Sequence, residues 1–81
     1  METINETMDI VVDNIIRLRK FKKITQIEMA SILGIKQNNY SQIETKRVTM
    51  SLDKLLKIAD FLEVEPTLLF KPLKFEVIIK N

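Results

Sequence analysis

The side chains best suited to specific recognition in this sequence are uncharged amides near the start of one predicted helix, residues 37–45. Tyr40 and Ile43 stand at i, i+3 spacing and define the inward face of that helix. The outward residues near its start are then Gln37, Asn38, Ser41 and Gln42. A planar amide donates and accepts hydrogen bonds together, which is what the exposed edge of adenine requires in the major groove of DNA. Contact with DNA bases is one interpretation of these amides, and an ordinary polar helix face is the other.

A second helix is predicted directly before this one. Thr25 followed by Glu28 is the start of a capping box, and Ala30 and Leu33 continue a helical stripe. Gly34 is the only glycine of the chain, and it can adopt the positive φ that ends a helix. Two short helices joined by a tight turn, with amides facing outward from the second, predict a DNA-recognition helix-turn-helix.

The net charge of +2 conceals an uneven distribution along the chain. Residues 1–14 sum to −4 and residues 15–50 to +6, whereas residues 51–70 sum to −2 and residues 71–81 to +2. The positive charge therefore surrounds the predicted helix-turn-helix, as expected of a module that meets phosphate groups. A solvated basic face without a partner is the alternative, because such faces are common on soluble proteins.

The composition excludes several other kinds of site. The 81 residues suffice for one domain, and they include no cysteine and no histidine, which excludes disulfides, zinc sites and imidazole catalysis. No glycine-rich phosphate loop or evident carboxylate pair points to an enzyme, so we expect no catalysis, no cofactor and no small-molecule ligand. No apolar run approaches the roughly 20 residues that cross a bilayer, and the acidic N-terminus lacks the features of a signal peptide. We expect a cytoplasmic protein without membrane contact.

Three further helices are predicted around the helix-turn-helix. The first begins near Thr7 to Asp9 and ends at about Lys22, with an apolar stripe at i, i+4, i+7 spacing. A fourth has Ser51 as its N-cap, and a short fifth covers residues 65–70 with Pro66 at its first position. The expected fold is all-α, a compact five-helix bundle with the helix-turn-helix as helices two and three. The expected division is a flexible N-terminal arm (1–8), a helix-turn-helix DNA-binding domain (9–70) and a C-terminal tail (71–81).

The C-terminal tail has a period of two instead of a helical period. Apolar residues from Leu73 to Ile79 alternate with mostly charged ones after Pro72, which predicts a short β-strand. A lone strand is not stable in water, so we expect it to pair with the same strand of a second copy across a two-fold axis. The expected dimer interface consists of Phe61, Phe70, Leu73, Phe75, Val77 and Ile79. A disordered tail and a helical extension of the core are the alternatives.

The stretches LRKFKKITQIEMASILGI, YSQIE and SLDKLLKIADFLEV resemble the helix-turn-helix family of lambda-type phage repressors, Cro proteins and bacterial regulators of the xenobiotic-response-element type. The resemblance covers roughly residues 9–70 without a gap. It implies a five-helix bundle in which helices two and three read DNA. It also implies that Gln37, Asn38 and Gln42 contact bases.

The resemblance assigns roles to residues around the recognition helix as well. Gln26, which opens helix two, is implied to bond both a phosphate and Gln37. Arg19 and Glu44 match an ion pair that ties helix one to the end of the recognition helix. Together with the basic loop after that helix, the expected phosphate contacts are Gln26, Lys36, Asn39, Ser41, Lys46 and Arg47.

The sequence departs from the family at several turns. Lys23, Lys46 and Glu63 stand where relatives often have glycine, so we expect these turns either to differ locally or to carry strained left-handed residues. Lys36 replaces the usual Ser or Thr cap of helix three, which loses about 1 kcal/mol of capping but adds a cation beside the DNA. Gln42 stands where many relatives have Arg or Lys, which favours adenine over guanine if the contact is bidentate.

The predicted function is that of a sequence-specific transcriptional regulator of double-stranded DNA, a repressor that acts as a homodimer on an operator. The recognition helix, about residues 37–45, would enter the major groove. The alternative is an antitoxin-like or adaptor module that uses its C-terminal strand to bind a protein partner.

Overall fold

The first helix, α1, is longer at its N-terminus than the sequence predicts. In the computed structural model, which describes residues 3–73, α1 spans Ile4–Phe21. Thr3 and Glu6 form a capping box: the Thr3 hydroxyl accepts from the Glu6 amide at 3.1 Å, and the Glu6 carboxylate accepts from the Thr3 amide at 3.3 Å. The prediction of a start near Thr7 to Asp9 is therefore wrong, because this cap lies one turn earlier. Most of the expected flexible arm, residues 1–8, is helical.

The two helices around Gly34 agree with the prediction. The helix α2 spans Gln26–Leu33 and α3 spans Gln37–Glu44. Thr25 and Glu28 form the expected capping box, and Gly34 has a φ of 68° in the left-handed region. A Cβ atom added to Gly34 would meet no atom within 4 Å, so the turn requires glycine for its backbone angle alone. Lys36 caps α3 without a side-chain hydrogen bond.

The remaining elements are α4 (Leu52–Leu62), capped by the Ser51 hydroxyl, and the 3-10 helix η1 (Pro66–Phe70). The prediction of a fifth α-helix over residues 65–70 is wrong in type. A segment of five residues is too short for an extended α-helical ladder, and its first bond runs from the Leu68 amide to the Glu65 carbonyl at 3.0 Å, an i→i+3 pattern. The described residues contain no β-strand, and all of the predicted strand except its first residue, Leu73, lies outside them.

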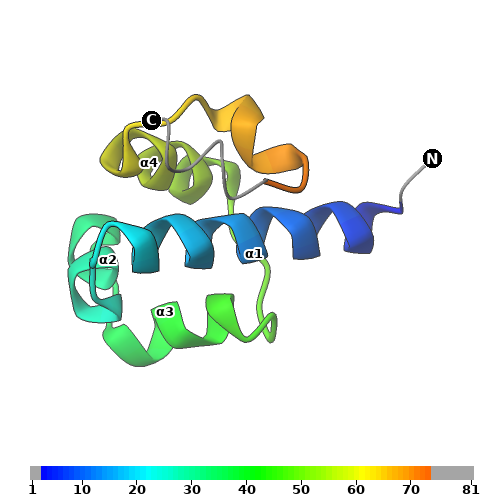
Figure 1. Ribbon diagram of the computed structural model, residues 1–81. Coiled ribbons are helices and arrows are strands. Elements are labelled where there is room, and N and C mark those ends of the chain that lie inside the picture. Colours follow the sequence, from blue (N-terminus) through cyan, green and yellow to red (C-terminus); the bar gives the residue numbers. More distant parts are fainter. Residues whose placement is uncertain (1–2, 74–81) are drawn as a thin grey trace.

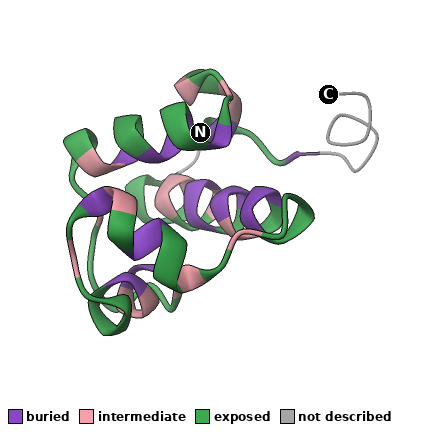
Figure 2. Cartoon of the chain, turned by 90° about the vertical axis from the view of Figure 1, so that its left-hand side faces the viewer, coloured by how far each residue is buried: buried purple, intermediate pink, exposed green. Residues whose placement is uncertain are grey.

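The helix α1 crosses the middle of the fold and separates two groups of elements. Figure 1 shows α3 on one side of α1 and α4 with η1 on the other, while α2 closes one end. The buried residues lie where these elements face one another, as the colours of Figure 2 show. The largest fully buried side chains are Ile15, Met29, Tyr40, Ile58, Leu62 and Leu69, which come from every helix. One core therefore fixes the position of α3 relative to α1.

Three residues other than glycine adopt left-handed backbone. Lys23, Lys46 and Glu63 have φ values of 59°, 66° and 60°. Of the two alternatives that the resemblance left for these turns, the structure has the second, left-handed backbone at the residue itself. A left-handed residue with a Cβ costs roughly 1–2 kcal/mol, so each of these turns stores strain that glycine would remove.

Glu63→Gly is expected to stabilise the fold by about 1 kcal/mol, because it relieves left-handed strain at the C-cap of α4. For a domain of this size, that raises the melting temperature by about 4–8 °C. Asp60→Gly is the matched control, because it removes the same charge from the interior of α4, where glycine costs about 1 kcal/mol. Thermal unfolding followed by circular dichroism measures both, and a lower melting temperature for Glu63→Gly would contradict the strain assignment.

Candidate nucleic-acid interface

The outer face of α3 carries the predicted base-contacting amides. Tyr40 and Ile43 are 0% and 4% exposed, and they hold α3 against the core. Gln37 and Asn38 are exposed, whereas Gln42 is half-buried. Gln37 and Asn38 are therefore accessible to a ligand, and Gln42 is partly enclosed by its surroundings.

The end of α3 is tied to α1 by an ion pair. The Arg19 Nε atom donates to Glu44 Oε2 at 2.6 Å, and Arg19 Nη2 donates to Glu44 Oε1 at 3.0 Å. The two side chains are only 10% and 7% exposed, and Arg19 also donates to the Ile24 carbonyl at 2.9 Å. This bidentate geometry fixes both partners, which makes the pair a rigid brace between the helices.

Two glutamines extend this ion pair to the surface. Gln26 Nε2 donates to Glu44 Oε1 at 2.9 Å, and Gln37 Nε2 donates to Gln26 Oε1 at 2.9 Å. The contact between Gln26 and Gln37 is the one that the family resemblance implies. A continuous path of hydrogen bonds therefore leads from the buried guanidinium of Arg19 to the exposed amide of Gln37.

The same cluster determines the protonation of its members. Burial by itself would raise the pKa of Glu44. Its pKa nevertheless lies below the usual 4.5, because the carboxylate is stabilised more strongly by Arg19, the Tyr40 hydroxyl and Gln26. Burial raises the pKa of Tyr40, and the neighbouring Glu44 carboxylate raises it further. Within the described residues, the Tyr40 hydroxyl has no hydrogen-bond partner of good geometry. Glu44 is therefore an anion at neutral pH and can only accept hydrogen bonds.

The loop after α3 is only partly free for phosphate contact. Lys46 Nζ lies 2.9 Å from Asp13 Oδ1 and 4.0 Å from Asp9 Oδ1, both on α1. The Asp13 carboxylate raises the pKa of Lys46 through this bond. Arg47 is exposed beside it. Lys46, predicted to contact phosphate, therefore has acidic partners already, which the sequence prediction did not include.

The other residues expected at phosphates lie around the start of α3 and α2. Lys36 and Asn39 are exposed, while Gln26 and Ser41 are half-buried. Gln26 opens α2, Lys36 is the N-cap of α3, and Asn39 and Ser41 lie within α3, so all four belong to the helix-turn-helix, whose two helices pack against each other.

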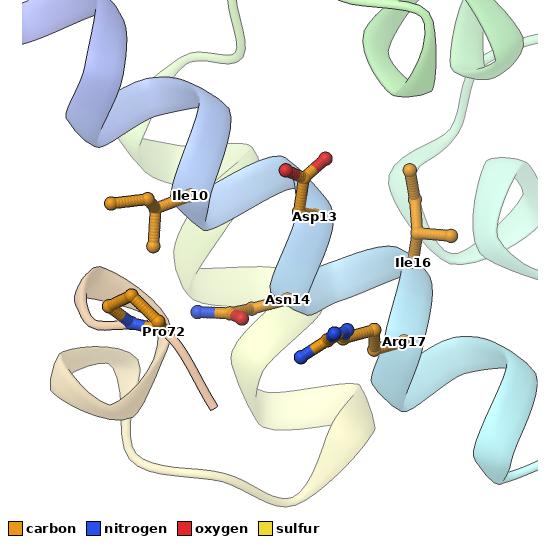
Figure 3. Close-up of a pocket in the computed structure, with 6 residues that line it drawn as sticks. All are labelled: Ile10, Asp13, Asn14, Ile16, Arg17 and Pro72. Atoms are coloured by element: carbon orange, nitrogen blue, oxygen red, sulfur yellow. The ribbon is translucent and has the colours of Figure 1, made fainter. Parts of the chain in front are cut away.

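Asn14 and Arg17 are structurally important residues to which the sequence reasoning gave no such role. Asn14 is 2% exposed, and its Nδ2 atom donates to the Leu69 carbonyl at 2.8 Å and to the Lys71 carbonyl at 2.7 Å. Arg17 Nη1 donates to the Leu73 carbonyl at 2.8 Å. Figure 3 shows both side chains extending from α1 on the side where Pro72 lies. The sequence did contain a signal for Asn14, because it is a polar residue at an inward position of the apolar stripe of α1. A buried polar side chain there requires hydrogen-bond partners.

The predicted dimer residues fall into three groups. Phe61 and Phe70 are 36% and 41% exposed, so both are available to a partner. Leu73 is 7% exposed and packs in the core of the monomer, which does not favour its assignment to an interface. Phe75, Val77 and Ile79 lie outside the described residues. Leu52 and Leu56, which were not predicted, are exposed along α4.

Residues 3–73 hold neither a membrane-spanning helix nor a cluster of metal ligands. None of the helices there combines the length and apolar character needed to cross a membrane. In the same residues no three acidic side chains gather where a metal ion could be held.

The sequence model of a family described as "Helix-turn-helix domain" matches residues 14–72, well over half of the chain. Searches of curated proteins and of solved structures gave no match.

Proposed function

Because the chain belongs to the Cro and lambda-repressor-like helix-turn-helix family, we propose that it is a sequence-specific transcriptional repressor that binds double-stranded DNA as a homodimer. In this proposal α3 enters the major groove, and Gln37, Asn38 and Gln42 contact base edges.

The observation that carries the proposal is the exposed amide face of a rigidly held helix. Gln37 and Asn38 are exposed at the start of α3, while the opposite face of α3 is buried and its end is braced by Arg19. A side chain that discriminates bases must be positioned to within a fraction of an ångström, because a bidentate contact tolerates little displacement. The packing of α3 supplies that precision.

Phosphate contacts would orient this helix on the duplex. The residues proposed for this role are Gln26, Lys36, Asn39, Ser41, Lys46 and Arg47. Arg47 and Lys36 carry exposed charges next to the two ends of α3, whereas Lys46 would have to leave or share Asp13. We therefore assign the stronger phosphate contacts to Arg47 and Lys36.

A homodimer would place two copies of α3 in successive major grooves on one side of the duplex, about 34 Å apart. Exposed apolar residues on α4 and η1 support self-association, and Leu52 and Phe70 line one groove of the surface. The tail would add its predicted strand to that interface. Light scattering of a chain ending at Leu73, which retains the core contact of this residue, tests the tail: a dimer of unchanged stability would contradict the strand-mediated interface.

Selection of bound sites from a random DNA pool is the direct test of the function. We expect enrichment of an inverted repeat with adenines in each half-site, bound with an affinity that falls steeply as salt rises. Enrichment of a single half-site would contradict the dimer, and no enrichment at all would contradict sequence-specific binding.

A protein-binding module is the second candidate, and the apolar groove that contains Leu52 and Phe70 favours it. An antitoxin-like or adaptor protein would use this surface for a different chain. A purified protein that remains monomeric and enriches no DNA site would favour this candidate over the repressor.

A further inference from the structure

Two acidic side chains of α1 lie at the point where the chain leaves α3. Asp13 Oδ1 lies 2.9 Å from Lys46 Nζ, and Asp9 Oδ1 lies 4.0 Å from the same atom. The two acids are four residues apart, so they share one face of α1. In Figure 3 the Asp13 side chain leaves α1 away from Pro72, whereas the Asn14 side chain extends toward it. The ammonium group of Lys46 therefore lies against a pair of carboxylates.

The backbone holds Lys46 in this position. Its φ is 66°, in the left-handed region, and its amide donates to the Ile43 carbonyl at 3.0 Å. The amide of the next residue, Arg47, donates to the Gln42 carbonyl at 2.9 Å. These bonds tie the start of the loop to the end of α3. The backbone of Lys46 therefore cannot move away from the two acids without breaking bonds to α3.

Lys46 is also one of the cations that the proposed function places beside DNA. Asp9 and Asp13 precede residues 14–72, which match the family, so they lie on a part of α1 outside that match. A carboxylate and a phosphate bind an ammonium group through the same charge-assisted hydrogen bonds. If Lys46 leaves Asp13 for a phosphate, the ion pair is lost. If Lys46 keeps Asp13, the carboxylate repels the phosphate beside it. Either way, the acids lower the affinity for DNA.

We propose that Asp13, assisted by Asp9, is an internal competitor of DNA for Lys46, which lowers the affinity for every duplex by the same factor and makes that affinity less dependent on salt. This inference rests on the proposed DNA-binding function. The factor is the same for every sequence, because phosphates carry no sequence information. The competition therefore leaves a larger share of the affinity for an operator to the base contacts of α3.

Asp13→Asn tests the proposal, because it removes the competing charge and keeps the size of the side chain. The Asp13 side chain is 58% exposed, so the fold should be retained. We expect operator and scrambled duplexes to bind about 5-fold more tightly at about 50 mM salt, because Lys46 gains a phosphate contact. One added contact steepens the slope of log affinity against log salt by about 0.9, so the gain should shrink about 3-fold by about 200 mM salt.

Lys46→Gln separates competition for Lys46 from a general effect of negative charge. In a protein that lacks the ammonium group at residue 46, Asp13→Asn should improve binding to the scrambled duplex by less than about 2-fold. The comparison uses all four combinations of the two substitutions. An equal gain from Asp13→Asn with and without Lys46 would mean that Asp13 only repels DNA, and would overturn the proposal.

Asp60→Asn is the matched control for the lost charge. Asp60 is an exposed acid of α4, which lies on the opposite side of α1 from α3 (Figure 1). Its replacement should change the affinity and the salt slope far less than Asp13→Asn does, and equal changes would contradict the competition. Asp9→Asn should have an intermediate effect, since its oxygen lies 4.0 Å from Lys46. Melting temperatures verify folding, and Asp9→Asn tests the same competition if Asp13→Asn lowers that temperature.

The outcomes distinguish this inference from the proposed function. If the wild type prefers the operator but folded Asp13→Asn binds both duplexes as the wild type does at every salt concentration, the competition is wrong and the function stands. If the wild type binds both duplexes alike, while Asp13→Asn binds both more tightly and with a steeper salt slope, the competition stands and sequence-specific recognition is wrong. Failure of both proteins to bind either duplex at low salt would overturn both proposals.

Discussion

Replacing Gln37 and Asn38 together with alanine is expected to weaken binding to a selected operator about 100-fold, because each well-placed base contact contributes roughly 1–3 kcal/mol. Both side chains are exposed on α3, and neither belongs to the core, so the fold should be retained. Binding to unrelated DNA at low salt should change little, since phosphate contacts supply most of that affinity. Fluorescence anisotropy with operator and scrambled duplexes measures the two affinities.

Asn39→Ala is the matched control for this double variant. Asn39 is an exposed asparagine of the same helix, which we assign to a phosphate. Its replacement should weaken binding to operator and scrambled DNA by the same factor. If the Gln37 and Asn38 variant instead lost both affinities equally, these residues would not be reading bases.

Glu44→Ala is expected to lower the free energy of unfolding by about 3–5 kcal/mol, because it leaves the guanidinium of Arg19 largely buried without its anion. Gln26 would lose its partner in the same step. Lys57→Ala is the control, since it breaks an ion pair with Asp53 at 3.5 Å whose side chains are 57% and 63% exposed. Such an exposed pair contributes about 0.5 kcal/mol or less. Urea unfolding at neutral pH measures the free energy of unfolding of both variants. Similar losses in Glu44→Ala and Lys57→Ala would contradict the role of the Arg19–Glu44 pair as a brace between the helices.

The ion pair also predicts how stability depends on pH. The folded pKa of Glu44 lies below 4.5, so its contribution is fully present above that pH and is lost as the pH falls through the lowered folded value. We expect the difference in stability between the wild type and Glu44→Gln to narrow in acid. If this difference in stability stayed constant down to pH 3, the charge of Glu44 would not be its cause.

A double variant, Arg19→Met with Glu44→Leu, separates the net contribution of the pair from the penalty of a lone buried charge. Replacing both partners by apolar residues of similar size should recover most of the stability that Glu44→Ala loses. Urea unfolding of the double variant beside Glu44→Ala measures this recovery, and a double variant as unstable as Glu44→Ala would contradict the penalty of a lone buried charge.

The local features of this fold were largely predictable from the sequence. The Thr25 capping box, the glycine turn and the start of α4 at Ser51 each depend on a few adjacent residues. The left-handed residues Lys23, Lys46 and Glu63 were one of two alternatives that the family resemblance left open, because an αL residue is a common way to end a helix. The errors were local as well: the cap at Thr3 was missed, and the short segment after Pro66 formed a 3-10 helix.

The sequence by itself determined the helices, the outward amides of α3 and the family, because helix periodicity and capping involve residues within one or two turns. Only the tertiary structure decided that Lys46 pairs with Asp13, that Asn14 bonds a carbonyl 55 residues away, and that Leu73 is buried in the monomer. It also decided that the ion pair continues through Gln26 to Gln37. A side chain can donate to many carbonyls and carboxylates, and the partner it meets is set by how the helices pack.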